Sequence, residues 1–178
     1  DQDRGAEPGP HRAGGVSGGG GGEGSRQHLA FEADVEHPGA LGEQPGERRL
    51  QILQTLASML GSPRGEKVTT AALAAKLDVS EAALYRHFAS KAQMFEGLIE
   101  FVETTIFTLA NKVQSAETDG VAQAEQIVSM LLGFAQKNPG MTRVLVGDAL
   151  VNEDERLQVR MNQMYDKLEA TLRHSLRT

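Results

Sequence analysis

The 178-residue sequence contains no cysteine, and this absence removes several classes of function at once. Without thiols there is no disulfide framework, no thiolate zinc site and no cysteine nucleophile. Long apolar runs are also missing, because no stretch approaches the roughly 20 residues that a membrane-spanning helix needs. The first 46 residues lack the apolar segment of a secretory signal. These absences favour a protein of the reducing cytoplasm that does not contact the membrane.

Catalytic and metal-binding patterns are likewise absent from the sequence. The five histidines, at positions 11, 28, 37, 87 and 174, do not have metal-ligand spacing. The run Gly18 to Gly22 has no strand before it and no helix in register after it, so it is not a phosphate-binding loop. We therefore expect a protein that is not an enzyme and that uses no metal or cofactor.

The net charge of −6 looks unsuitable for binding nucleic acid, but the charge is unevenly distributed. Residues 1–46 carry three arginines and eight acidic residues, a net charge of −5. Residues 47–91 carry seven basic and four acidic residues, which gives +3. Residues 92–178 carry eight basic and twelve acidic residues, which gives −4. A basic segment between two acidic ones indicates contact with a polyanion such as duplex DNA.

Glycine and proline separate a first segment from a helical remainder. Residues 1–46 hold 13 of the 20 glycines and four of the six prolines. This composition buries too little apolar surface to offset the entropy of ordering, so we predict a disordered arm over residues 1–46.

Helical periodicity begins after Gly46 and continues to the end of the chain. Apolar residues spaced by three and four predict an all-α fold, with no strand pattern. The expected helices end near Leu60, Leu77 and Phe88, and a long helix follows with Ser90 as its expected cap. The residues expected on the buried stripes are Leu50, Leu53, Leu56, Ala57, Leu60, Phe95, Leu98, Ile99, Val102, Ile106, Leu109, Val113, Ala124, Ile127, Val128, Leu131, Phe134, Leu157, Met161, Met164, Tyr165, Leu168 and Leu172.

One stretch of the basic segment carries the motif on which the functional prediction depends. It predicts two short helices, the first capped by Thr69 or Thr70 and the second by Ser80. A helix-turn-helix needs a small residue where its two helices cross, and Ala74 supplies one. Its three-residue turn needs a residue that tolerates positive φ, and Asp78 does so better than most residues. These features favour a helix-turn-helix over an ordinary helical hairpin.

The second helix of this motif would enter the major groove with its N-terminal end. Arg86 suits a guanine or a phosphate, while Ala82 and Ala83 suit thymine methyl groups. Tyr85 and His87 suit phosphates. The sequence also allows partial burial for Tyr85 and a solvated helix end for His87.

Lys91 gives a separate indication of DNA contact. It lies in the first turn of the next helix, where a cation opposes the helix dipole. A phosphate bound at that helix terminus would explain its presence. The complete set of residues expected at the DNA is Lys67, Thr69, Thr70, Ser80, Glu81, Ala82, Ala83, Tyr85, Arg86, His87 and Lys91.

The sequence from Leu73 to Phe95 resembles the TetR family of bacterial DNA-binding regulators. The resemblance rests mainly on the run Val79 to Phe88 and on Ser90-Lys91. It implies a three-helix helix-turn-helix head over residues 47–91, which a fourth helix joins to a helical regulatory and partner-binding body over residues 92–178. Two residues depart from the family pattern: Asp78 replaces the usual turn glycine, and Ala89 replaces a proline.

Residues 47–178 also resemble the nucleoid occlusion branch of this family. The segments that carry this resemblance are Ser80 to Phe88, Met94-Phe95, Leu98 to Phe101, Leu131 to Phe134, Asn138 to Gly140 and Thr142-Arg143. It implies a nucleoid-associated homodimer that binds palindromic chromosomal sites and inhibits ring assembly by the division GTPase FtsZ. The residues implied at the partner surface are Phe101, Gly133, Lys137 and Asn138. The family continues beyond Thr178 into helices that build the dimer interface, so these are expected to be missing here.

Several alternatives stay open from the sequence. Phe101 equally suits core packing, and Gly133 a close helix crossing. The runner-up function is a ligand-responsive TetR-type repressor with a pocket in the body. Met130, Phe134, Met161 and Met164 are its candidate lining residues, although a methionine-rich core also explains them. A helical adaptor that does not bind DNA is a third possibility, against which the basic segment argues.

Overall fold

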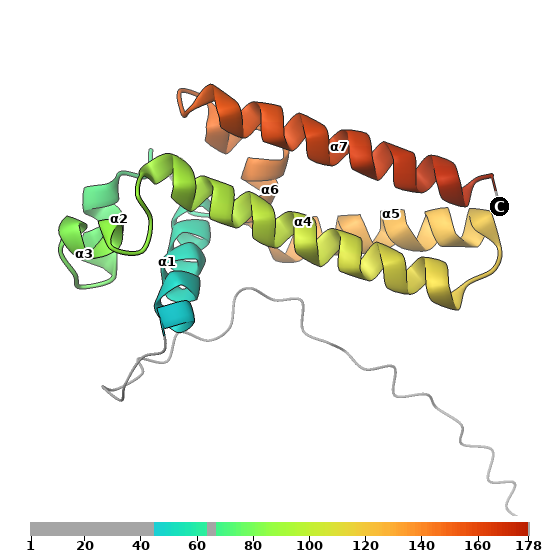
Figure 1. Cartoon of the computed structure of the whole chain (residues 1–178), viewed down its shortest axis with the longest axis horizontal. Helices are drawn as coiled ribbons and strands as arrows, with labels where there is room; N and C mark the ends of the chain where they lie inside the picture. Colours follow the sequence, from blue (N-terminus) through green and yellow to red (C-terminus); the bar gives the residue numbers. More distant parts are fainter. Residues whose placement is uncertain (1–44, 64–66, 178) are drawn as a thin grey trace, which may run out of the picture.

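The computed structural model describes residues 45–63 and 67–177 (Figure 1). Within these ranges the fold is entirely helical and contains no strand, which confirms the all-α class. The elements are α1 (Pro45–Leu60), α2 (Thr70–Lys76), α3 (Glu81–Tyr85), α4 (Lys91–Ala116), α5 (Gly120–Lys137), α6 (Pro139–Leu145), the short 3-10 helix η1 (Asp148–Leu150) and α7 (Glu155–Ser175).

The first helix begins earlier than the sequence suggested. The predicted arm included residues 45 and 46, but α1 already starts at Pro45. Proline is favoured at the first position of a helix because its φ is fixed and no N–H is left unpaired there. The remainder of the predicted arm, residues 1–44, lies outside the described residues.

The helices form a small head and a longer body that share α4 as a connection (Figure 1). α1, α2 and α3 make up the head, and α4 leads from it into the body. α5 and α7 pack along α4, while α6 packs against α1. With 26 residues, α4 is about 39 Å long at 1.5 Å per residue.

One continuous hydrophobic core runs from the head into the body. Ile52 and Leu56 of α1 belong to the same buried cluster as Phe95 of α4 and Met161 of α7. The stripe predictions are confirmed for most core positions. Ile52, together with Met94 and Ala110 of α4, is also buried although the predicted stripes left these residues out.

Three residues of the predicted stripes are exposed instead: Leu50, Val128 and Tyr165. Leu50 lies on the side of α1 that the other helices leave uncovered, whereas Ile52 and Leu53 are buried. Val128 follows the buried Ile127 on α5. This helix has apolar residues on its exposed face as well as on its buried face, and Val128 lies on the exposed one. Tyr165 lies at the edge of α7, where its hydroxyl donates to the Leu145 carbonyl at 2.8 Å.

α6 crosses α1 at very short range. A Cβ atom on Gly140 would lie only 1.9 Å from the carbonyl oxygen of Ala57, so no larger residue fits without moving the backbone. The Arg143 guanidinium donates to the Leu60 carbonyl at 2.9 Å and so binds the last turn of α1. This crossing attaches the head to the body through the backbone of both helices.

Candidate nucleic-acid interface

The two helices of the predicted motif are capped as the sequence indicates. Thr69, rather than Thr70, caps α2 by accepting from the Ala72 N–H at 3.1 Å. Ser80 caps α3 by accepting from the Ala83 N–H at 3.2 Å. Asp78 has φ of 55°, which confirms that the turn uses a residue in the left-handed region. Each cap satisfies an amide that the helix start leaves unpaired.

Ala74, the small residue predicted where the two helices cross, is buried in the head. Leu73, Ala74 and Leu84 are buried between α2, α3 and their neighbours, and Leu77 and Val79 pack against them. α3 ends at Tyr85, three residues before the expected end near Phe88. The chain then continues in a turn in which the Phe88 N–H still donates to the Leu84 carbonyl at 3.1 Å.

Three of the predicted DNA-contact residues form one exposed polar group across α2 and α3. The Thr70 hydroxyl donates to the Glu81 carboxylate at 2.7 Å. The Tyr85 hydroxyl in turn donates to the Thr70 oxygen at 3.4 Å. With 43% of its surface exposed, Tyr85 is not a core residue. This group orients Glu81, the acidic residue at the start of the predicted groove-entering helix.

Other predicted residues line a hollow between α1 and the helix-turn-helix. The hollow has a volume of about 190 Å³. Ala83, Arg86 and His87 line it together with Arg48 of α1. Ala83 is therefore half-buried beside α1, whereas Ala82 is exposed. Lys67, just before α2, is exposed as well.

Arg49 supports this region, and the sequence analysis assigned it no role beyond its charge. Its guanidinium lies 4.1 Å from the centre of the Phe88 ring and also donates to the His87 carbonyl. Arg49 thereby links α1 to the turn that follows α3. In the sequence, Arg48 and Arg49 stand out only as two consecutive basic residues. Which residues they contact depends on the fold.

The start of α4 is arranged more specifically than the sequence indicated. Ser90 caps the helix by accepting from the Gln93 N–H at 3.2 Å. The Ala89 N–H donates to the Gln93 side chain at 3.0 Å. A proline at position 89, as in the family pattern, would lack this N–H. The departure at Ala89 therefore adds a hydrogen bond to the helix start.

Lys91 makes an ion pair with the body in this structure. Its ammonium lies 2.6 Å from the Glu153 carboxylate, in the segment that leads into α7. The same ammonium lies 5.8 Å from the centre of the Phe95 ring. The contact between Lys91 and a DNA phosphate stays a prediction.

Of the four residues predicted at a partner surface, two are accessible on α5. Lys137 is exposed, and a Cβ on Gly133 would meet no atom within 4 Å, so no close helix crossing requires a glycine there. Phe101 is half-buried and packs against the core. Asn138 is only 3% exposed, and its side-chain amide donates to the Phe134 carbonyl at 2.8 Å. It is therefore a buried C-cap residue of α5.

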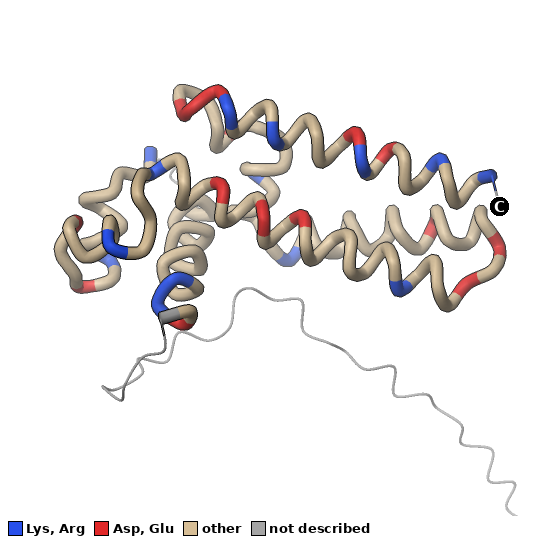
Figure 2. Tube along the Cα trace, in the orientation of Figure 1, with Lys and Arg blue, Asp and Glu red and all other residues tan. Residues whose placement is uncertain are grey.

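Acidic residues follow the first half of α4 and gather at the start of α7 (Figure 2). Glu103 of α4 pairs with Lys167 and lies 3.8 Å from Arg160, both on α7. Within residues 45–63 and 67–177, no cluster of acidic or histidine side chains is placed to hold a metal ion. The described helices also include none that is long and apolar enough to cross a membrane.

The capped helix-turn-helix, its exposed polar face and the attached helical body define a DNA-binding regulator. Two family models match the chain in agreement with this class. Residues 64–98 match the bacterial regulatory proteins of the tetR family. Residues 118–178 match the SlmA-like model, described as the tetracyclin repressor-like C-terminal domain.

Curated relatives specify the class further. The chain is 53% identical over 137 residues to the nucleoid occlusion factor SlmA of Marinomonas sp. (strain MWYL1), covering 77% of this chain and 70% of the relative. It is 55% identical over 130 residues to that of Alteromonas mediterranea, covering 73% and 67%. The factor from Escherichia coli O9:H4 is 53% identical over 131 residues, covering 73% and 66%. The chain belongs to the nucleoid occlusion factor SlmA family, within the TetR family.

Proposed function

We propose that the chain acts as a nucleoid occlusion factor: it binds palindromic sites on the chromosome and inhibits FtsZ ring assembly over the nucleoid. One observation carries this proposal: the chain is 53% and 55% identical to two curated nucleoid occlusion factors over 77% and 73% of its length. The similarity therefore includes the body as well as the head. In this function the protein acts by binding and not by catalysis, it uses no cofactor, and it is located on the nucleoid.

The head would dock by placing the N-terminal end of α3 in the major groove. Thr69 and Ser80 start α2 and α3, and the exposed group of Thr70, Glu81 and Tyr85 lies across both helices. Palindromic sites would match a homodimer, because two identical heads related by a two-fold axis read two half-sites. The division into a DNA-binding head over residues 47–91 and a partner-binding body over residues 92–178 is part of this proposal.

The body would contact FtsZ through the C-terminal half of α5. Gly133 leaves the α5 surface open for close approach, and Lys137 offers a cation in the last turn. Asn138 would act indirectly, since its buried amide holds the end of α5. For the alternative ligand pocket no observation stands out: Phe134, Met161 and Met164 are members of the packed core.

The separation of the two surfaces is tested by Lys137→Glu. We expect this variant to keep its affinity for duplex DNA, measured by fluorescence anisotropy, and to lose FtsZ binding, measured by co-sedimentation with FtsZ polymers. Arg177→Glu is the matched control, because it makes the same charge change at an exposed position at the end of α7. Equal FtsZ binding by Lys137→Glu and Arg177→Glu would show that the partner surface is not at the end of α5.

A further inference from the structure

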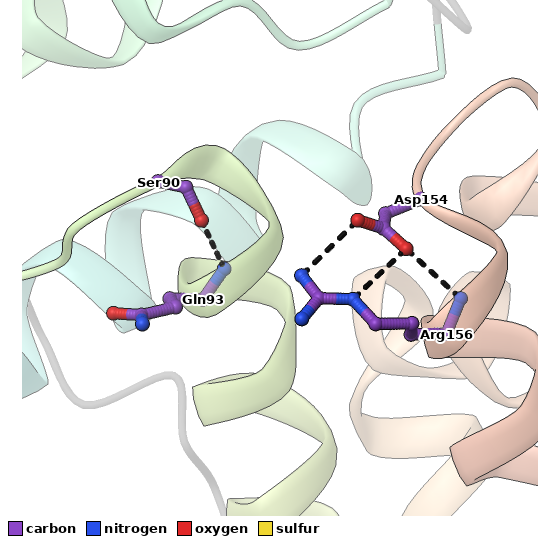
Figure 3. A network of polar contacts seen from close by, with 4 residues as sticks. All are labelled: Ser90, Gln93, Asp154 and Arg156. Atoms are coloured by element: carbon purple, nitrogen blue, oxygen red, sulfur yellow. Dashed lines mark hydrogen bonds and ion pairs between the residues drawn. The ribbon is translucent and has the colours of Figure 1, made fainter.

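The first turn of α4 and the segment that leads into α7 form a polar joint between head and body. Figure 3 shows the contacts within each of the two helix starts, Ser90 with Gln93 and Asp154 with Arg156. Lys91 of α4 and Glu153, which precedes α7, form the contact between the two segments, with nitrogen and oxygen 2.6 Å apart. Their side chains are only 22% and 12% exposed, so water screens this pair less than the surface pairs of the protein. The electrostatic attraction between these two charges is therefore stronger than in an exposed ion pair of the same length.

The fold holds Glu153 in place independently of Lys91. Asn152 has φ of 64°, a left-handed conformation that turns the chain just before Glu153. The Glu153 N–H donates to the Leu150 carbonyl at 3.0 Å. Asp154 then caps α7 by accepting from the Arg156 N–H at 3.0 Å. Backbone contacts on both sides thus direct Glu153 to the start of α4.

Two neighbouring charges, those of Asp154 and Arg156, pair with each other. The Asp154 carboxylate accepts from the Arg156 guanidinium at 3.1 Å (Figure 3). The Arg156 guanidinium has its pKa raised by this hydrogen bond first, then by the charges of Asp154 and Glu96. Glu153 is thus the carboxylate of this segment that the Lys91 ammonium contacts.

Lys91 also lies close to the recognition helix along the chain. α3 ends at Tyr85 and α4 begins at Lys91, so only residues 86–90 separate them. The Ser90 cap leaves the helix start with its positive dipole end directed toward the head. A DNA backbone that follows α3 would therefore meet Lys91 at the boundary between head and body.

We propose that Glu153 sets the DNA affinity of the head from the body, by competing with a DNA phosphate for the Lys91 ammonium. In the free protein Glu153 holds this ammonium, and on DNA binding a phosphate takes its place. The inference rests on the proposed DNA contact of Lys91.

The test is Glu153→Gln, which keeps the size of the side chain but removes its charge. We expect it to tighten binding to duplex DNA about three- to ten-fold, measured by anisotropy on one palindromic and one unrelated duplex, because a phosphate contact is largely independent of sequence. Glu155→Gln is the matched control, since it removes the same charge two residues further on from an exposed side chain. It corrects for general repulsion between an acidic residue and DNA.

A second background shows whether Glu153 acts through Lys91. Lys91→Met is combined with the otherwise wild-type protein and with Glu153→Gln. In this background the gain in DNA affinity caused by Glu153→Gln should fall to that caused by Glu155→Gln. Circular dichroism confirms that each variant is folded. Weaker DNA binding by Glu153→Gln, or a gain no larger than that of Glu155→Gln, would overturn the competition. A gain that persists in full with Lys91→Met would overturn it too. Failure of the wild type to bind either duplex would instead contradict the proposed function itself.

Discussion

Two of the contacts that attach the head to the body differ in kind. At the first, α6 crosses α1 with Gly140 against the Ala57 carbonyl, and Arg143 binds the Leu60 carbonyl. At the second, α4 and the start of α7 meet through Lys91 and Glu153. The first contact depends on close packing of the two helix backbones, whereas the second is an ion pair, in which either charge can also pair with another ion.

This difference suggests how one molecule can hold its head firmly and still respond to DNA. Close-packed contacts have one good arrangement, because any shift leaves a void or a clash. An ion pair at a partly exposed site can be replaced by another pair of similar energy. The α1–α6 crossing therefore fixes the position of the head, while the α4–α7 joint is the place where DNA and body would be coupled.

The largest effect is expected when the close-packed attachment is broken. Gly140→Ala places a Cβ against the Ala57 backbone oxygen, so α1 and α6 must separate. We expect the free energy of unfolding to fall by about 3 kcal/mol, the upper end for overpacking. Urea denaturation followed by circular dichroism measures this change.

Gly133→Ala is the matched control for this experiment. It makes the same substitution within α5, where a Cβ meets no atom within 4 Å. Since alanine favours a helix interior over glycine, we expect Gly133→Ala to stabilise the protein by up to about 1 kcal/mol. A small effect of Gly140→Ala, similar to that of Gly133→Ala, would mean that the crossing is not close-packed in solution.

A smaller effect is expected at the start of the polar joint. Ser90→Ala removes the oxygen that accepts from the Gln93 N–H at the first turn of α4 (Figure 3). We expect a loss of about 1 kcal/mol in unfolding free energy, as for other helix caps. Ser90→Asp restores an acceptor and should recover stability. No recovery with Ser90→Asp would show that the Ser90 side chain acts by some contact other than the cap.

The smallest effect is expected from the exposed charges of the same joint. Hydrogen bonds from the Arg156 side chain, and then from its backbone, hold the pKa of Asp154 below its ordinary value of 3.8. A depressed pKa gives a stabilising contribution that is present above pH 3.8 and is lost as the pH falls through the folded-state pKa. Carboxyl-carbon NMR titration should show Asp154 titrating below 3.8, and Arg156→Gln should raise its midpoint. A wild-type midpoint at or above that value would contradict the contacts.

The sequence predicted those features that depend on neighbours along the chain. The caps at Thr69, Ser80 and Ser90 and the left-handed turn at Asp78 are local, so residue type and spacing were enough to find them. Helical periodicity likewise located most of the core. The failures at Leu50 and Val128 arose because periodicity identifies an apolar face but not how much of it another helix covers.

Features that depend on distant pairs could not be predicted in this way. In the sequence, Gly140 follows a proline and is typical of a break between helices. Only the crossing with α1 explains why a side chain is excluded at this position. Glu153 lies 62 residues beyond Lys91, and no local pattern connects them. Asn138 looked like a surface residue at a helix end, but the turn into α6 buries it.

An FtsZ polymerisation assay shows whether this protein joins DNA binding to division inhibition. FtsZ would be polymerised with GTP in the presence of the protein alone, a tightly bound duplex alone, or both, and the polymer would be measured by sedimentation. We predict that the amount of polymer falls most when protein and duplex are present together, and that an unrelated duplex has less effect. An unchanged amount of polymer under all these conditions, with DNA binding intact, would contradict the account.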